Sequence, residues 1–106
     1  MKKVLLLLPL FLFAFNPEVK IKEIDSIIAL YKNRIKCLDK NEANYCIDRY
    51  PQDSRSDAFA KTFCMSFPKN YYKALLEKNI KRLEAEKLCY GRSLTEKEAQ
   101  ECLKKL

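Results

Sequence analysis

Histidine is absent from the 106 residues of this chain, and glycine occurs only once. Without histidine, no Ser-His or Cys-His nucleophile pair can form, and the commonest metal ligand of proteins is missing. One glycine cannot build a Gly-rich phosphate-binding loop. The Cys-x-x-Cys spacing of thioredoxin-like redox sites and zinc sites is absent as well. These absences predict a protein that is not an enzyme and has no catalytic residue, no cofactor and no bound metal.

The chain is also poor in turn signals. It contains four prolines, no Asn-Gly or Asp-Gly pair, and no long stretch in which polar and apolar residues alternate. Such alternation marks half-buried strands, and those dipeptides mark tight hairpins. Helical spacing of apolar residues is present instead. The sequence therefore predicts an all-α fold, a small compact bundle of four to five helices of unequal length.

The N-terminus has the pattern of a secretory signal peptide. Lys2 and Lys3 precede an apolar run of twelve residues at 4–15. This run is shorter than the roughly 20 apolar residues of a transmembrane helix and fits the roughly 7–15 residues of a signal-peptide core. Ala14 offers a small residue for cleavage, although Leu12 does not complete the A-x-A pattern. We expect export, to the periplasm or by secretion, with an uncleaved short membrane anchor as the alternative.

A helix start follows the apolar run directly. Asn16 is a good cap, Pro17 suits the first helical position, and Glu18 lies where the helix dipole favours an acid. We therefore divide the chain into a signal peptide at 1–15 and a single small helical domain at 16–106, with no stable transmembrane segment in the mature part. Loss of the two N-terminal lysines leaves the mature chain modestly basic, two charges below the net +7 of the whole chain.

Apolar spacing and helix breakers predict where the helices lie. A three-four repeat marks the buried seam of a helix from Pro17 to about Leu38, made by Ile21, Ile24, Ile28, Tyr31, Ile35 and Leu38. Further helices are expected at about 40–49, at about 70–90, and from Thr95 to about 104. One more helix is expected between the first two of these, after a loop at 51–57. Pro51 and Pro68 end two of them, and Gly91 is expected as a left-handed terminus of the helix at 70–90.

An aromatic stripe marks the helix that follows the loop. Phe59, Phe63 and Phe67 recur at intervals of four. Aromatic residues at helical spacing are most often part of a core, and we expect these rings to be buried. Cys64, which lies between Phe63 and Met65, is expected to be a small buried side chain as well.

Two segments, DKNEANYC at 39–46 and TEKEAQEC at 95–102, share one pattern. A polar residue, Asp39 or Thr95, is followed three positions later by a glutamate, as in a capping box. We therefore expect each segment to begin a helix, with a cysteine seven residues past the cap. The match has two interpretations, a true duplication and convergent capping.

All five cysteines lie beyond the apolar N-terminus. After a secretory signal, and in a domain of this size, they predict a disulfide framework rather than a metal cluster. The disulfide candidates are Cys37, Cys46, Cys89 and Cys102. Cys64 is the possible free cysteine, with an intermolecular bond as its alternative.

The connectivity of the cysteines stays open at this point. Local bonds, Cys37–Cys46 and Cys89–Cys102, are the simplest arrangement. If the capped helix runs back antiparallel, Cys46 lies about 10 Å below its start, whereas bridged Cα atoms lie within about 7 Å of each other. Local pairing therefore requires an irregular or strongly angled turn. A crossed arrangement, or a Cys46–Cys64 bond, is the alternative.

The function predicted from these features is binding without catalysis. Basic and tyrosine residues mix most densely at 69–82, but glutamate interrupts them and an exported protein rarely meets nucleic acid, so no nucleic-acid partner is expected. We expect a small exported protein that acts on a protein or cell-envelope partner, of unknown identity and with unknown oligomeric state. The alternative is a small-ligand or metal-binding carrier in the periplasm. Its apolar cavity would lie between the face of Phe59, Phe63 and Phe67 and the first helix.

Overall fold

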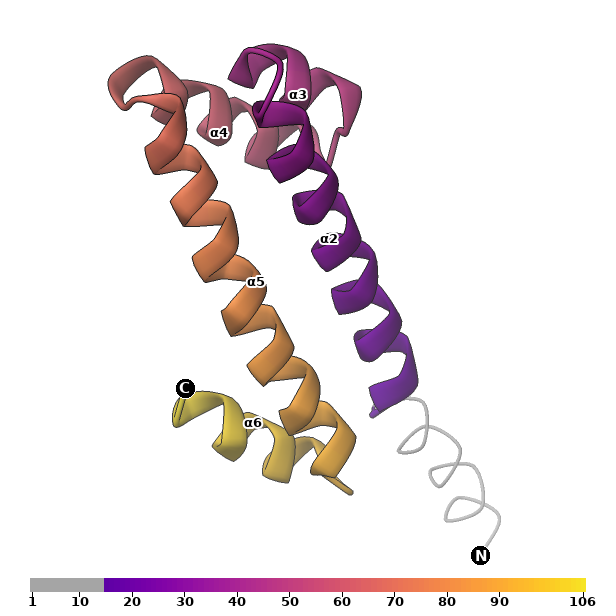
Figure 1. Cartoon of the computed structure of the whole chain (residues 1–106). Coiled ribbons are helices and arrows are strands. Elements are labelled where there is room, and N and C mark those ends of the chain that lie inside the picture. Colours follow the sequence, from indigo (N-terminus) through magenta and orange to yellow (C-terminus); the bar gives the residue numbers. More distant parts are fainter. Residues whose placement is uncertain (1–14) are drawn as a thin grey trace, which may run out of the picture.

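A computed structural model describes residues 15–106 of the chain, and these residues form five helices and no strand (Figure 1). The helices are α2 (Pro17–Leu38), α3 (Ala43–Arg49), α4 (Ser54–Ser66), α5 (Lys69–Arg92) and α6 (Glu96–Lys104). The predicted all-α fold with helices of unequal length is therefore confirmed. The predicted signal peptide at 1–15 lies, apart from its last residue, outside the described residues. None of the five helices has the length and apolar character needed to cross a membrane.

The two long helices, α2 and α5, run antiparallel and side by side (Figure 1). An ion pair between Lys87 Nζ and Asp25 Oδ1, 2.8 Å apart, links them on the surface. The short helices α3 and α4 lie across one end of this pair, and α6 folds back across the other end. The antiparallel pair of α2 and α5 thus joins two ends that are built differently.

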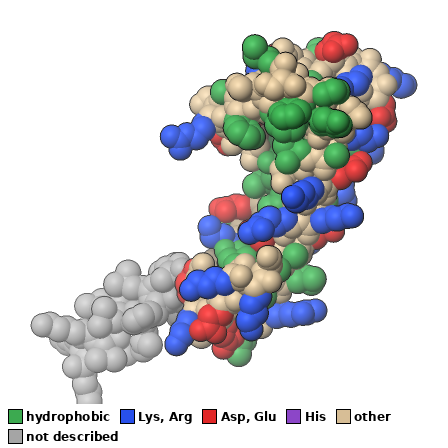
Figure 2. Space-filling view, turned by 90° about the vertical axis from the view of Figure 1, so that its left-hand side faces the viewer, with side chains coloured by type: hydrophobic (Ala, Val, Ile, Leu, Met, Phe, Trp, Pro, Cys, Tyr) green, Lys and Arg blue, Asp and Glu red, His purple; other side chains and the backbone are tan. Residues whose placement is uncertain are grey.

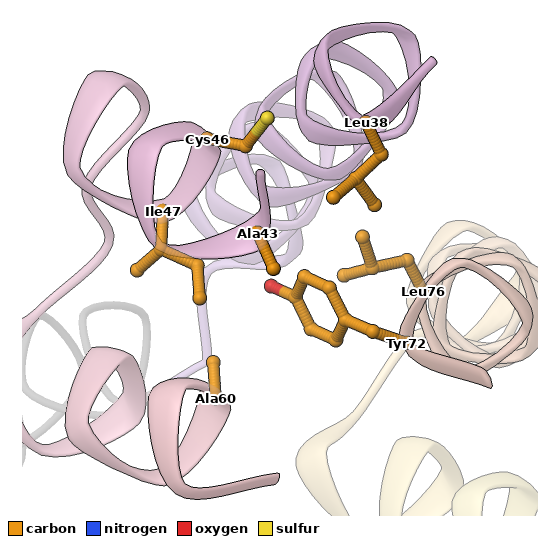
Figure 3. Close-up of a cluster of buried hydrophobic side chains, with 7 residues drawn as sticks. All are labelled: Leu38, Ala43, Cys46, Ile47, Ala60, Tyr72 and Leu76. Carbon is orange, nitrogen blue, oxygen red and sulfur yellow. The ribbon is translucent and has the colours of Figure 1, made fainter. Parts of the chain in front are cut away.

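A cluster of buried apolar side chains fills each end. The first cluster joins α2, α3, α4 and α5 through Leu38, Ala43, Cys46, Ile47, Ala60, Tyr72 and Leu76 (Figure 3). The second joins α2, α5 and α6 through Ile24, Ile28, Ile80, Tyr90 and Ala99. Tyr31 and Ile35 pack against both clusters, so the core is continuous along α2. The seam predicted for this helix is the face that the structure buries.

The start of α3 differs from its prediction. The helix begins at Ala43, and Asp39 is the C-cap of α2 instead of the N-cap of the next helix. The capping box predicted for Asp39 is therefore wrong, because the backbone N–H groups of Lys40 and Asn41 both donate to the Cys37 carbonyl and prolong the end of α2. Glu42 occupies the N-cap of α3 without a side-chain hydrogen bond.

The end of α5 also differs. Gly91 was predicted to adopt a left-handed conformation, but it has no positive φ and lies inside the helix, which continues to Arg92. The C-cap is Ser93 in an extended conformation, and its hydroxyl donates to the Cys89 carbonyl oxygen at 2.6 Å. This bond satisfies a terminal carbonyl, so the helix ends without a left-handed residue.

The N-caps of α4 and α6 use acceptor side chains. Asp53 caps α4, where its carboxylate accepts from the backbone N of Ser56 at 2.8 Å, so this helix begins inside the loop predicted at 51–57. This bond holds the pKa of Asp53 below its ordinary value. Thr95 caps α6 as predicted, with its hydroxyl oxygen accepting from the backbone N of Glu98 at 3.2 Å.

Candidate functional site

A charged side chain lies inside the first cluster: Arg34, on α2, is only 1% exposed. Its Nε donates to the Tyr50 carbonyl oxygen at 2.9 Å, its Nη1 to the Tyr72 hydroxyl oxygen at 3.1 Å, and its Nη2 to Asp57 Oδ1 at 2.8 Å. Burying an ion costs several kcal/mol unless it is paired and hydrogen-bonded. Here one guanidinium meets a carboxylate and two neutral acceptors. It therefore ties α2 to α4, to α5 and to the turn that follows α3.

The sequence prediction did not include Arg34. A signal for it exists, because Arg34 lies three residues after Tyr31 and four before Leu38, on the seam of α2. A cation at such a position needs a buried partner. The partner, Asp57, comes from another helix 23 residues later, and the sequence does not identify it.

The partner carboxylate is itself held in place. Both oxygens of Asp57 accept from the backbone N of Gln52, at 3.2 and 3.1 Å. The Gln52 side chain in turn accepts, through Oε1, a hydrogen bond from the Tyr31 hydroxyl at 3.1 Å. These bonds fix the segment between α3 and α4 over the surface of α2.

Tyr72 contributes the third partner of the guanidinium. Figure 3 shows its ring reaching from α5 into the space between α2, α3 and α4, with the hydroxyl oxygen at the inner end. Burial raises the pKa of Tyr72 above its ordinary value, and the nearby Arg34 opposes part of this rise. The phenol is therefore protonated at neutral pH and accepts the hydrogen bond from Arg34 as a neutral group.

A cavity of about 350 Å³ lies beside this network, between α2, α4 and α5. Polar groups on its wall come from Tyr31, Arg34, Gln52, Arg55, Ser56 and Asn79. Its apolar wall is made by Phe59, Ala60, Tyr72, Leu75 and Leu76. Both charged residues on the wall are arginines, and no acidic side chain lines it. The predicted cavity position is therefore correct in part: Phe59 and the first helix, α2, line this space, whereas Phe63 and Phe67 do not.

The aromatic stripe is largely on the surface, so its predicted place in the core is wrong. Phe59 is 67% exposed and Phe67 is 46% exposed, and only Phe63 is half-buried. The physical reason is that α4 packs through Ala60, the one residue of this helix that is buried. The rings on either side of this narrow contact lie at its margin, and Phe59 and Phe67 face outward.

The rings of Phe63, Phe67 and Tyr71 form a row of neighbours, and together with the exposed Phe59, one turn before Phe63, they are here called the aromatic ridge. The rings of Phe63 and Phe67 stack with centroids 4.7 Å apart, and that of Tyr71 lies 6.0 Å from Phe67. Tyr71 is 53% exposed. Figure 2 shows hydrophobic side chains gathered on the surface at the end of the molecule where α3 and α4 lie.

The structure joins the cysteines locally, as Cys37–Cys46 and Cys89–Cys102, with Cα atoms 5.7 and 5.6 Å apart. The late start of α3 makes the first bond possible, because Cys46 then lies in the first turn of its helix and close to the end of α2. In the second pair, Cys102 lies deeper in α6, and Cys89 lies correspondingly one turn before the end of α5. The irregular turn that local pairing required is thus present at the first bond.

Cys64 forms no disulfide. It is half-buried, rather than buried as predicted, beside the exposed Met65. Burial raises the pKa of the Cys64 thiol, and the charge of Arg34 lowers it by less. The thiol is therefore neutral and weakly nucleophilic at neutral pH.

No group of three His, Cys, Asp or Glu side chains placed to hold a metal ion occurs in the part of the chain that the structure describes. Comparisons of the chain with protein-family models, with curated protein sequences and with solved structures find no match. The chemistry of the site is therefore argued from its own residues.

Proposed function

We propose that this chain is a non-enzymatic binding protein of an oxidising compartment, and that it docks onto a protein of the cell envelope through the aromatic ridge. The observation that carries the proposal is the exposure of neighbouring aromatic rings on one end of the molecule. Contiguous exposed apolar patches mark interaction surfaces. Aromatic side chains are also enriched among the residues that dominate binding energy.

The ridge is held on a rigid support, which favours binding. Ala60 fixes α4 against the core, and Asp57, in the first turn of the same helix, is bonded to the buried Arg34. The stacked pair of Phe63 and Phe67 further limits ring motion. Association therefore orders few additional side chains, and the entropy cost of binding is small.

The compartment follows from the cysteines and the N-terminus together. Two disulfides are consistent with an oxidising compartment. The apolar run that follows Lys2 and Lys3 supports export to the periplasm or secretion. N-terminal sequencing of the protein recovered from outside the cytoplasm tests this part. A start near Asn16 is expected, and an intact N-terminus on cytoplasmic protein contradicts it.

The docking proposal is tested with two matched double variants. Phe59→Ser with Phe67→Ser removes the outer rings of the ridge, whereas Leu88→Ser with Leu94→Ser removes exposed apolar groups at the α6 end. Quantitative capture from envelope extract is expected to recover the same protein with wild type and the leucine variant, and to lose it with the phenylalanine variant. Equal loss with both variants, or no reproducible partner, contradicts the proposal.

A lipid surface is the competing target of exposed aromatic rings. Co-sedimentation with vesicles of neutral and anionic lipid, in the absence of other proteins, measures this directly. Negligible lipid binding by wild type is expected. Vesicle binding that disappears in the variant of Phe59 and Phe67 replaces the protein partner with the membrane.

A further inference from the structure

The cavity between α2, α4 and α5 has features that docking by the aromatic ridge does not use. Its volume of about 350 Å³ lies at the lower end of the ~300–1,000 Å³ typical of small-molecule sites. Its lining combines the polar side chains of Arg34 and Arg55 with the apolar side chains of Phe59, Leu75 and Leu76. A molecule that has both a polar and an apolar part fits such a lining.

The buried guanidinium has hydrogen-bonding capacity to spare. An arginine side chain has five N–H donors, and Arg34 uses three of them, toward Tyr50, Asp57 and Tyr72. The second N–H of Nη1 and that of Nη2 have no acceptor within residues 15–106. Arg34 lines the cavity although only 1% of it is exposed, so any additional acceptor for these donors has to come from the cavity side.

The charge of the cavity sets the charge of the occupant. Asp57 neutralises Arg34 at 2.8 Å, and it is not one of the residues that line the cavity. Arg55, in the first turn of α4, has neither an ion pair nor a side-chain hydrogen bond with any described residue. The cavity lining therefore carries two guanidinium groups and no carboxylate, and the planar donor geometry of a guanidinium suits a carboxylate ligand.

We propose that this cavity binds a small organic monoanion, a carboxylate with an apolar or aromatic body. The carboxylate accepts from the spare N–H groups of Arg34 and pairs with Arg55. The body lies against Phe59 and Leu75, and covers part of the phenylalanine ring that is otherwise exposed. This site shares Phe59 with the aromatic ridge and none of the other ridge residues.

The test uses a matched pair of probes, 4-phenylbutyrate and the uncharged alcohol 4-phenyl-1-butanol, with protein that has both disulfides formed. Titration followed by two-dimensional amide NMR gives the affinity and locates the site. Saturable binding of the acid is expected, with shifts centred on residues of the cavity wall, and the alcohol is expected to bind about tenfold more weakly because it lacks the charge-assisted bonds.

Variants then separate this site from a general basic or apolar surface. Arg55→Gln is expected to weaken acid binding about tenfold and to leave alcohol binding unchanged. Lys78→Gln, a matched loss of one charge on the exposed side of α5, is expected to change neither. Leu75→Trp, which fills the cavity, is expected to abolish binding of both probes, with folding checked by circular dichroism.

Four results overturn the proposal. These are no saturable binding of the acid at millimolar concentration, equal affinity for acid and alcohol, wild-type affinity in Arg55→Gln, and shifts centred on Phe67 and Tyr71 instead of the cavity. Because Arg55 is exposed at the start of its helix, its variant stays folded even if Leu75→Trp does not. Phe67→Ser alone alters the aromatic ridge but not the cavity lining, so it is expected to bind both probes as wild type does, and failure of docking is thereby distinguished from failure of this site.

Discussion

The α3–α4 end of the molecule and the α6 end are each closed by a disulfide, but the residues buried at the two ends differ in kind. At each end a disulfide joins a cysteine near the end of a long helix to a cysteine in a short one, with Cα separations of 5.7 and 5.6 Å. The first end encloses a guanidinium and its three partners. The second encloses Ile24, Ile28, Ile80, Tyr90 and Ala99, with no buried charge among them.

The buried residues at the two ends therefore differ in what they contribute to the molecule. At the α6 end, an uncharged cluster closed by a short helix stabilises the pair of long helices. The α3–α4 end instead buries a costly ion, exposes the aromatic ridge and contains the cavity. Such a combination is inefficient for stability alone, which supports our proposal that binding surfaces lie at this end.

The largest effect is expected from removing the buried cation. Arg34→Met leaves the carboxylate of Asp57 and the hydroxyl of Tyr72 without their partner, and we expect a loss of about 3–5 kcal/mol in the free energy of unfolding. Urea denaturation followed by circular dichroism measures it. Arg82→Met is the matched control, because its pair with Glu86 is long, at 3.9 Å, and the Arg82 side chain is 62% exposed. About 0.5 kcal/mol or less is expected there.

A second substitution tells a charge effect from a packing effect. Adding Asp57→Asn to Arg34→Met removes the stranded charge and keeps an oxygen to accept from Gln52, so part of the loss is expected to return. If the double variant is less stable than Arg34→Met alone, Asp57 contributes to stability mainly through its hydrogen bonds with Gln52, and its pairing with Arg34 contributes less. A loss below about 1 kcal/mol in the single variant contradicts the special role of this end.

Removing the two disulfides one at a time compares the ends directly. Replacing both cysteines of a pair by alanine is expected to cost about 2–4 kcal/mol in either case. Loop length alone makes Cys89–Cys102 the more stabilising bond by about 0.3 kcal/mol, because its sequence separation is 13 against 9. We expect the opposite order, since Cys46 belongs to the first cluster and Cys37 packs against it.

The same denaturation measurement decides between these orders. A larger loss for Cys37→Ala with Cys46→Ala supports the coupling of the first bond to the core. A larger loss for the second pair indicates that chain entropy alone determines both contributions. Cys64→Ala in each background prevents disulfide exchange with the remaining thiol.

Alkaline pH is expected to lower the free energy of unfolding through Tyr72, which lies at the α3–α4 end. Burial raises the folded-state pKa of Tyr72 above the ordinary value of 10.0, so the unfolded chain loses this proton first. The contribution of Tyr72 is therefore complete below pH 10 and is lost as pH rises through the folded pKa. Unfolding curves at pH 8 and pH 10.5 are expected to show a smaller decline for Tyr72→Phe than for wild type. Equal declines contradict this assignment.

The features that the sequence predicted correctly are those decided by neighbouring residues. The seam of α2, the cap at Thr95 and the all-helical class depend on spacing and on local hydrogen bonds within one or two turns. Local disulfide pairing was foreseen among several possibilities. The irregular turn it required comes from two N–H groups donating to the Cys37 carbonyl, a detail that residue types alone do not determine.

The features that the sequence did not predict depend on which helices pack against each other. The rings of Phe59 and Phe67 have the spacing of a core stripe, yet α4 has a neighbour only on its Ala60 side. Arg34 resembles any surface cation until Asp57 and Tyr72 are placed beside it. The candidate site is made almost entirely of such long-range contacts, and it was therefore the part least accessible from the sequence.

The smallest expected effect concerns the N-caps of α3 and α6. Thr95→Ala removes the acceptor for the backbone N of Glu98, and a loss of about 1 kcal/mol is expected. At the other end, Glu42 occupies the N-cap of α3 in an extended conformation with no side-chain bond, so Glu42→Ser is expected to gain up to about 1 kcal/mol. The two changes in unfolding free energy should therefore have opposite signs. A loss in both variants shows instead that Glu42 stabilises α3 through its charge near the helix N-terminus, and that the two ends are capped by different means but to a similar degree.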